Sequence, residues 1–505
     1  MTSPVAAEPV RFGTPQGRWV LTAMVMGSGI AMLDATVVNV ALRPIGAELG
    51  ADLAGLQWIL NGYLLTLASL ILLGGSLGDR YGRRRVFVVG VVWFALASLL
   101  CGIAPNVPTL IAARALQGVG GALLTPGSLA ILQASFHPDD RARAIGAWSG
   151  LGGLATAIGP FLGGYLVDQV DWRWIFLINL PVAVLVVLSA VRHVPESSDP
   201  TLAPGLDVAG ALCGALGLGG VTYALIEGPA RGATSPEILI TAIGGAAALV
   251  GFVVTERRSP HPMLPLDVFA SRQFTSANLV TFAVYAALGA VFFLLVVNLQ
   301  TVLGYSALQA GTASLPVTVI MLLFSSRAGQ LAARIGPRVP MTAGPLVAAA
   351  GLVLMTRIVE GATYVGAVLP AIAVFGAGLA LTVAPLTATV LAAAPAEHAG
   401  SASGVNNAVA RVAGLLAVAV LPAVAGLSGD DYADPAAFSS GFRVAILVSA
   451  ALCAAGGAIA WTTIRNDVLQ RDDGGDPIPP HPHTEDVCCG AGAPPLRPAG
   501  SASRP

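Results

Sequence analysis

The fold of this chain is decided by the segment Gly75-Ser76-Leu77-Gly78-Asp79-Arg80-Tyr81-Gly82-Arg83-Arg84-Arg85. This turn places one acid and four arginines between two long apolar segments. So much charge is unfavourable in hydrocarbon, so the turn must lie in water at one face of a membrane. Clustered arginine beside membrane helices marks the cytoplasmic side. We therefore expect this turn to be cytoplasmic and to orient the whole protein.

The composition indicates a polytopic membrane protein. The chain is 55% hydrophobic and 10% charged, whereas soluble domains carry about 25% charged residues. A net charge of −1 leaves no basic face for nucleic acid. All 26 basic residues are arginine, which excludes a Walker A lysine and a lysine Schiff base. We therefore expect no cofactor, and either an ion gradient or a partner as the source of energy.

Hydropathy predicts fourteen membrane spans, each near the 20 residues that a bilayer requires. They are expected at about 19–41, 56–77, 86–104, 109–133, 144–167, 174–191, 206–226, 237–254, 279–300, 312–331, 341–359, 364–392, 402–426 and 441–464. An even number places both termini on one side. With the amino terminus inside, the inner segments hold sixteen arginines and the outer loops hold five. This bias predicts that both termini are cytoplasmic.

An internal repeat divides the chain. The segment from Gly329 to Arg338 repeats the glycines and arginines of the first turn, with Ala333 in place of the acid. Two repeated halves are typical of transporters. The predicted parts are a cytoplasmic tail (1–18), a six-helix half (19–192), two inserted helices (205–255), a second six-helix half (279–464) and a disordered cytoplasmic tail (465–505).

Four further segments resemble motifs of one family. Leu33–Leu42 resembles the helix 1 signature of the fourteen-helix drug:proton antiporters, and Arg114–Ala122 resembles the helix 4 motif that serves proton coupling. Gly159–Gly164 resembles the helix 5 antiporter motif, and Trp172–Pro181 a hallmark at the start of helix 6. Together with the first turn, these segments identify the chain as resembling the major facilitator superfamily. Ala155 departs from the helix 5 pattern, which usually has a glycine there.

This resemblance implies roles for two groups of residues. The charged turn would latch the two halves together in the outward-facing state, and the helix 5 motif would permit close helix packing. The latch residues are Gly75, Gly78, Asp79, Arg80, Gly82, Arg83 and Arg84, and the helix 5 residues are Gly159, Pro160, Gly163 and Gly164. Gly159-Pro160 is also expected to interrupt the hydrogen bonds of its helix and bend it.

Asp34 and Arg114 are the candidates for proton coupling. Asp34 is the only acid well inside a predicted span, where an ionisable side chain is usually functional or paired. Arg114 is never neutral, so inside the membrane it needs an acceptor or water. We expect Arg114 to face Asp34 and to control its protonation. The alternatives are an Asp34 bonded to helix backbone and an Arg114 paired with carbonyl groups.

Polar residues inside the spans predict a substrate cavity. Its expected lining residues are Asp34, Asn39, Gln117, Asn406, Asn407 and Arg411. Arg411 could instead reach toward the cytoplasmic end of its helix. The six histidines all lie in predicted loops or the tail, and none has metal-ligand spacing, so no metal site and no enzyme are expected.

These observations predict an exporter in a bacterial cytoplasmic membrane. It would act as a monomer and exchange lipophilic small molecules, such as drugs or antibiotics, for protons by alternating access. With one buried acid, neutral compounds and monocations should be favoured over dications. The alternatives are a dedicated exporter of one metabolite and, from another class, a membrane receptor that does not transport.

Overall fold

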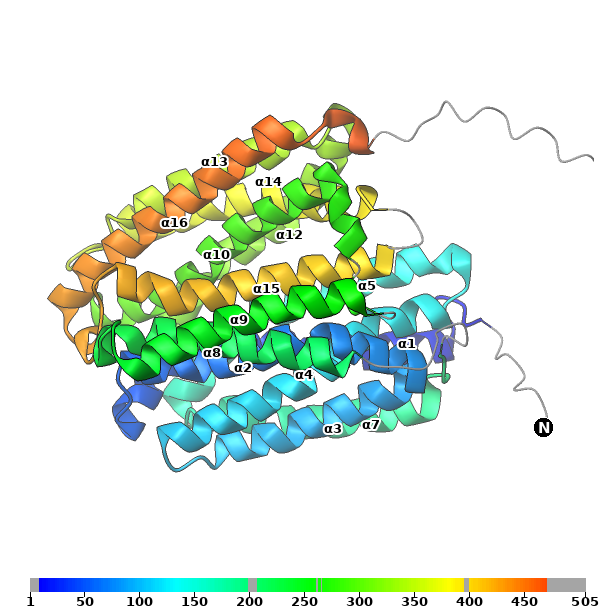
Figure 1. Ribbon diagram of the computed structural model, residues 1–505, viewed down its shortest axis with the longest axis horizontal. Coiled ribbons are helices and arrows are strands. Elements are labelled where there is room, and N and C mark those ends of the chain that lie inside the picture. Colours follow the sequence, from blue (N-terminus) through cyan, green and yellow to red (C-terminus); the bar gives the residue numbers. More distant parts are fainter. Residues whose placement is uncertain (1–8, 199–206, 260–261, 265, 395–398, 470–505) are drawn as a thin grey trace, which may run out of the picture. The chain divides into compact units, whose positions relative to one another are not determined.

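The computed structural model describes residues 9–198, 207–259, 262–264, 266–394 and 399–469. Within these ranges, fourteen helices are long and apolar enough to cross a membrane (Figure 1). The predicted all-helical fold and the number of spans are confirmed. The predicted disordered tail lies, from residue 470 onward, outside the described residues.

The first six spans occupy the chain up to His193. They are α1 (Pro15–Leu49), α2 (Leu53–Tyr81), α3 (Arg83–Gly102), α4 (Val107–Ser135), α5 (Pro138–Gln169), and α6 (Trp174–Leu177) with α7 (Asn179–His193). Polar caps begin three of these helices: Thr14, Asp52 and Asn106 each accept a hydrogen bond from the backbone N–H three residues later. Such caps satisfy N–H groups that have no partner within the helix.

Two additional helices, α8 (Val208–Arg231) and α9 (Pro236–Arg258), precede the last six spans. The last six spans are α10 (Arg272–Thr301), α11 (Ala307–Ala313) with α12 (Leu315–Ile335), α13 (Arg338–Met355), η2 (Tyr364–Val368) with α14 (Leu369–Ala392), α15 (Ala399–Val424) and α16 (Pro435–Thr463). Short turns of 3-10 helix lie at η1 (Leu266–Ala270), η4 (Asp431–Ala433) and η5 (Asn466–Leu469). Helix α8 packs on α9, and also on both α2 and α15 (Figure 1).

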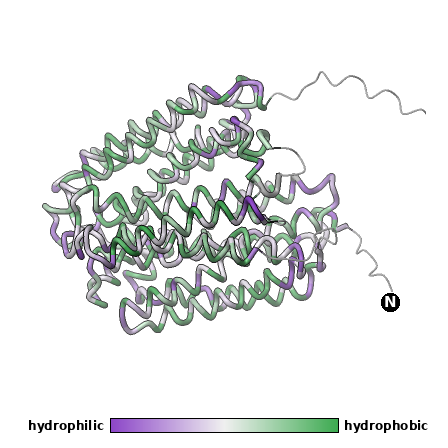
Figure 2. Tube along the Cα trace, in the orientation of Figure 1, coloured by the Kyte–Doolittle hydropathy of each residue, from purple (hydrophilic) through white to green (hydrophobic). Residues whose placement is uncertain are grey.

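The surface of the helices is apolar. Figure 2 shows hydrophobic residues along most of each helix, with hydrophilic ones gathered towards the helix ends and the connecting loops. On α9, Ile240, Ile243 and Val250 are 70%, 68% and 64% exposed. An exposed apolar band of this kind is unfavourable in water and suits a lipid environment. The exposed face of α9 is therefore suited to contact with lipid.

The two turns of the predicted repeat share a local construction. Gly82 and Gly336 both have positive φ, +108° and +88°, a region that disfavours residues with a Cβ. A Cβ on Gly82 would also lie 2.8 Å from the carboxyl carbon of Glu196, just after α7. A Cβ on Gly336 would lie 2.5 Å from Asn466 Oδ1, just after α16. Each turn thus packs against the segment that follows the sixth span of the same six-helix half.

The expected bend of the fifth span at Gly159-Pro160 stays a prediction. Helix α5 continues without interruption through Pro160, from Pro138 to Gln169. A proline removes one N–H donor from the helix, but neighbouring helices can support such a helix inside a membrane. Packing of α5 against α1 and α11 supplies that support here.

Candidate proton and substrate site

Asp34 and Arg114 form an ion pair in the interior of the bundle. The Arg114 Nη1 atom donates to Asp34 Oδ2 at 2.6 Å, and each residue is 1% exposed. Gln117, one turn along α4 from Arg114, donates from Nε2 to Asp34 Oδ1 at 2.9 Å. Both oxygens of the Asp34 carboxylate therefore accept hydrogen bonds from α4. The buried ion pair joins α1 to α4.

Arg114 has additional partners besides Asp34. Its Nε atom donates to the backbone oxygen of Ile59 at 3.1 Å, and Nη1 also donates to Gln117 Oε1 at 2.5 Å. The guanidinium carbon lies 4.4 Å from the centre of the Tyr63 ring and 5.7 Å from that of Phe176. Aromatic faces stabilise a cation that has lost its water. Arg114 therefore has several favourable contacts that do not involve Asp34.

The polar network extends beyond the residues that the sequence singled out. Gln117 Nε2 also donates to Ser98 Oγ at 2.8 Å, and Asn179 Nδ2 donates to the same oxygen at 3.3 Å. Ser98 had no signal of its own in the apolar α3. Asn179 lies in the hallmark segment at the start of the sixth span, and a polar residue within that apolar run was the available clue.

The three predicted asparagines lie elsewhere. Asn39 donates to Ala35 O of its own helix at 3.1 Å. Asn406 donates to Asn278 Oδ1 and Thr281 Oγ1 of α10, at 3.1 and 2.7 Å. Asn407 is exposed. None of these bonds reaches Asp34, so their role in a substrate cavity stays a prediction.

Within the described part of the chain, the charged turn is bonded to the first half only. Arg83 Nε donates to Asp79 Oδ1 at 2.8 Å, and Arg84 Nη1 donates to Val194 O at 3.0 Å. Glu196, which sequence reasoning missed, lies 3.7 Å from both Arg84 and Arg85. The Nε and Nη1 atoms of Arg80 are buried without a hydrogen-bond partner. The latching role of the turn stays a prediction.

The helix 5 glycines lie where neighbouring backbones come close. A Cβ on Gly159 would lie 2.1 Å from Thr36 Oγ1, and one on Gly163 would lie 2.7 Å from Val37 Cγ1, both on α1. A Cβ on Gly164 would lie 2.5 Å from Leu308 Cα on α11. Gly311 of α11 in turn lies against Pro160 O. The motif thus packs α5 against both its own half and the second half.

Hydrogen bonds between the two series of spans gather at one end of the bundle, where α1 ends and α2 begins. Within the described ranges, these bonds are Asp168 with Ala307 N (3.1 Å) and Leu308 N (2.9 Å), Gln300 with Val40 O (2.8 Å), Tyr432 with Ala51 O (2.8 Å), Leu53 N with Gly429 O (2.8 Å), and Gln57 with Val418 O (2.6 Å) and Ala419 O (3.3 Å). By the arginine distribution this end is the outer one. The bundle is therefore joined by polar bonds at its predicted outer end.

The two additional helices, α8 and α9, bring acidic side chains into buried positions. Asp207 and Glu256 are 8% and 3% exposed. One oxygen of each carboxylate has no hydrogen-bond partner. Glu227 accepts from Trp58 Nε1 of α2 at 2.9 Å and pairs with Arg231 at 2.8 Å. Tertiary packing, which hydropathy cannot anticipate, covers these acids.

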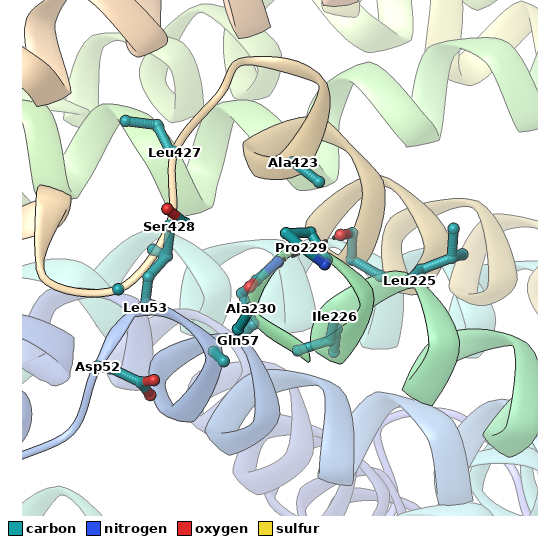
Figure 3. A pocket seen from close by; sticks show the side chains of 13 residues that line it. Asp52, Leu53, Gln57, Leu225, Ile226, Pro229, Ala230, Ala423, Leu427 and Ser428 are labelled. Atoms are coloured by element: carbon teal, nitrogen blue, oxygen red, sulfur yellow. Dashed lines mark hydrogen bonds between the residues drawn. The ribbon is translucent and has the colours of Figure 1, made fainter. Parts of the chain in front are cut away.

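A small crevice lies between the start of α2, the last turn of α8 and the end of α15, at the predicted outer end (Figure 3). Its volume is about 20 Å³, and Asp52, Gln57, Leu225 and Pro229 are among its lining residues. This space admits about one water molecule. Neither Asp34 nor Arg114 lines it, so the crevice is separate from the buried ion pair.

Residues 24–418 match the Major Facilitator Superfamily. The chain belongs to this superfamily. It is 37% identical over 407 residues to the multidrug resistance protein Stp of Mycobacterium tuberculosis (strain CDC 1551 / Oshkosh), covering 80% of this chain and 75% of that protein. It is 35% identical over 489 residues to the puromycin resistance protein pur8 of Streptomyces alboniger, covering 93% and 97%. It is also 34% identical to the tetracenomycin C resistance and export protein of Streptomyces glaucescens, covering 82% and 77%.

Solved structures of the superfamily share the fold. A bacterial homologue of the human lysosomal transporter Spinster superimposes with a TM-score of 0.63 at 16% identity, covering 91% of this chain and 99% of that one. A POT family transporter in complex with a thioalcohol-conjugated peptide gives a TM-score of 0.65 at 14% identity, covering 88% and 95%. With its fourteen spans, the chain is a multi-pass cell-membrane protein of a transporter superfamily rather than an enzyme.

Proposed function

We propose that this protein exports lipophilic small molecules, drugs or antibiotics among them, in exchange for protons. The observation that carries the proposal is the buried pair of Asp34 and Arg114, whose atoms are 2.6 Å apart. An ion pair inside a membrane bundle is costly, and intramembrane ionisable groups serve proton relays and substrate sites. The relatives named for multidrug, puromycin and tetracenomycin C resistance support a drug as the cargo.

In this proposal Asp34 carries the proton. When Asp34 is ionised, Arg114 and Gln117 hold its two oxygens. When a proton binds, the ion pair loses its attraction, while Arg114 keeps Ile59 O, Gln117 Oε1 and the Tyr63 ring. The arginine is thus stabilised in both states, which lowers the cost of exchanging the proton. Release of α1 from α4 then couples protonation to movement of the helices.

Alternating access supplies the second half of the mechanism. The polar bonds between the halves lie at the predicted outer end, which suits a state that is closed to the outside. Breaking these bonds and joining the inner ends through the charged turn would give the opposite state. The unpartnered Arg80 nitrogens would then gain an acceptor from the second half.

The available energy is sufficient for this exchange. One proton that enters down about 100 mV and one pH unit releases roughly 3.7 kcal/mol. That free energy supports a gradient of about 500-fold for a neutral compound. For a monovalent cation the exchange is electroneutral, so only the pH difference contributes and the limit is about tenfold.

Uptake into everted vesicles tests the proposal. Wild type, Asp34→Asn and the control Asp139→Asn would be compared under an imposed pH gradient with neutral, cationic and anionic lipophilic compounds. Asp139 is 74% exposed in its side chain, so its charge is not part of the buried network. We expect uptake that an uncoupler abolishes in wild type and in the control, and none in Asp34→Asn. Equal gradient-driven uptake by all three proteins would refute proton exchange at Asp34.

A dedicated exporter of one metabolite is the second candidate. Two relatives are named for export of a single compound: the tetracenomycin C resistance and export protein and a probable actinorhodin transporter from Streptomyces coelicolor. Uptake of a broad panel by the wild type would favour multidrug export. Uptake confined to one chemical series would favour the dedicated exporter.

A further inference from the structure

Helices α2 and α15 form a direct seam between the two halves. Towards the outer end, Gln57 Nε2 donates to Val418 O at 2.6 Å. Towards the inner end, a Cβ on Gly404 would lie 3.1 Å from Leu72 Cδ2. The two helices therefore run antiparallel along their contact, and residues between these points face one another across the seam.

Arg411 and Asn61 both lie on this seam. On α15, positions 404, 408, 411, 415 and 418 recur at steps of four and three, which places them on one face. Ala408, on the same face, packs against the core of the first half. On α2, Asn61 follows Gln57 by four residues and lies on the same face as it. The seam thus carries one amide and one guanidinium in its middle part.

Asn61 is fully buried without partners. Its exposed fraction is 0%, and neither Oδ1 nor Nδ2 makes a hydrogen bond with any residue that the structure describes. Such an amide is unfavourable, because it has lost its bonds to water and gained none in the protein. Leucine has a similar size and would avoid this penalty. In a conformation that uncovers it, this amide would regain hydrogen-bond partners.

Arg411 is half-buried, and none of the described residues accepts a hydrogen bond from it. Its position on the face of α15 that meets α2 places it between the two halves. Asp34 does not neutralise it, because both Asp34 oxygens already accept from Arg114 and Gln117. Among the described residues, the positive charge of Arg411 therefore has no counter-charge.

We propose that Arg411 and Asn61 anchor an acidic group of the exported compound, so that the substrates include lipophilic weak acids; this inference rests on the proposed export function. A guanidinium offers paired N–H groups that match a carboxylate. Arg411 binds the acid in the conformation seen here. Asn61 adds its amide donor when the Gln57–Val418 contact separates and the seam opens.

Charge strengthens the driving force for such a substrate. Exchange of an entering proton for a leaving anion moves two charges per cycle in the favourable direction. About 100 mV and one pH unit then support a gradient on the order of 10⁴-fold, well above the limit for a neutral compound. An acidic substrate is therefore the class that this exchange concentrates most strongly.

Equilibrium binding to the purified full chain tests the anchor. Three fluorescent probes with one ring system would be used: anthracene-9-carboxylate, 9-anthracenemethanol and 9-(aminomethyl)anthracene. We expect wild type to bind the carboxylate most tightly. Arg411→Gln should weaken carboxylate binding at least tenfold with less effect on the alcohol, and Arg411→Lys should recover part of the loss. Arg327→Gln is the matched control, because Arg327 is also within a span but exposed beside Phe324.

Asn61 is tested by transport. Asn61→Leu should fold at least as stably as wild type, because it removes an unpartnered amide. It should slow vesicle uptake of the carboxylate at least threefold, and more than uptake of the alcohol. Uptake of the carboxylate at the wild-type rate would exclude Asn61 from the anchor.

Three results would overturn the proposal for Arg411: no carboxylate binding by wild type, a preference of wild type for the ammonium probe, or equal carboxylate affinity of wild type and Arg411→Gln. Binding needs no proton gradient, so these results are independent of the export test. Carboxylate binding that depends on Arg411, without any gradient-driven uptake, would instead refute the export function and leave the site in place.

Discussion

Arg114 Nη1 and Asp34 Oδ2 lie 2.6 Å apart with both side chains withdrawn from the surface, so that α1 and α4 are joined by opposite charges. Removing one member of a buried ion pair leaves the other uncompensated, at a cost of about 3–5 kcal/mol. Removing both avoids that cost. The pair is therefore a source of strong energetic coupling between two positions.

This coupling predicts non-additive effects on stability. Asp34→Asn and Arg114→Gln should each lower the free energy of unfolding, and the double variant should lose less than the sum of the two. We expect a coupling of about 1–3 kcal/mol, within the range for residues in one network. Unfolding of the purified proteins in detergent measures it. Additive losses would show that the ion pair contributes little to the fold.

Gln117 is predicted to be needed for rapid transport. It donates to Asp34 and Ser98 and accepts from Arg114, so Gln117→Leu leaves all three groups with one partner fewer. Uptake into everted vesicles should fall at least tenfold. Gln169→Leu, at an exposed position on α5, is the matched control and should keep the wild-type rate. Wild-type uptake by Gln117→Leu would remove Gln117 from the coupling mechanism.

Two glycines on α5 allow a matched test of helix packing. A Cβ on Gly159 would lie 2.1 Å from Thr36 Oγ1, whereas one on Gly153 would meet nothing within 4 Å. Gly159→Ala should therefore destabilise the protein by about 1–3 kcal/mol, as overpacking does. Gly153→Ala should be near neutral or slightly stabilising. Thermal unfolding of the two variants measures the contrast, and equal melting temperatures would contradict close packing at Gly159.

Asp168 is predicted to favour the conformation that is closed at the outer end. Its two oxygens accept from Ala307 N and Leu308 N of α11. Asp168→Asn weakens this contact because one oxygen becomes an amide, and the charge is lost. Spin labels at positions 169 and 305 should then report a larger fraction of long distances by electron resonance.

The control for that measurement is Asp171→Asn. Asp171 pairs with Arg173 rather than with the second half, so the distance distribution should stay as in wild type. A shift in both variants would indicate a general loosening of the loop after α5. No shift in either would show that Asp168 does not set the balance between conformations.

Membrane potential should separate the three anthracene probes. If one proton enters for each molecule exported, collapse of the potential by potassium and valinomycin removes two charges of driving force for the carboxylate. It removes one for the alcohol and none for the ammonium compound. The concentration ratio reached by each probe measures this order. Equal sensitivity of all three would contradict exchange with a single proton.

The membrane spans and the charged turn could be predicted because each follows from the composition of a single segment. The arginines of residues 80–85 cannot enter hydrocarbon, and the apolar runs around them have the length of a bilayer, so both the spans and the turn follow from local composition. Asp34 and Arg114 were recognisable for the same reason, since each is an ionisable residue in an apolar run. Their pairing was expected and is found.

Other contacts could not be predicted, because they depend on which segments pack together in the folded protein. Ser98 joins the network only because α3 and α4 pack together, and no periodicity marks it. Glu196 lies beside the arginine turn although 112 residues separate it from Arg84. Asp207 is buried because it packs against α9, near Glu256.

The amino-acid sequence by itself therefore determined the fourteen spans, the charged turn and the two ionisable residues at the centre, because the bilayer penalises polar groups one segment at a time. Only the tertiary structure decided that both oxygens of Asp34 are occupied, that Asn61 is buried without partners and that Arg411 has no counter-charge among the described residues. Hydrogen bonds and charge compensation depend on atoms within about 3 Å, and those atoms come from helices far apart in the chain.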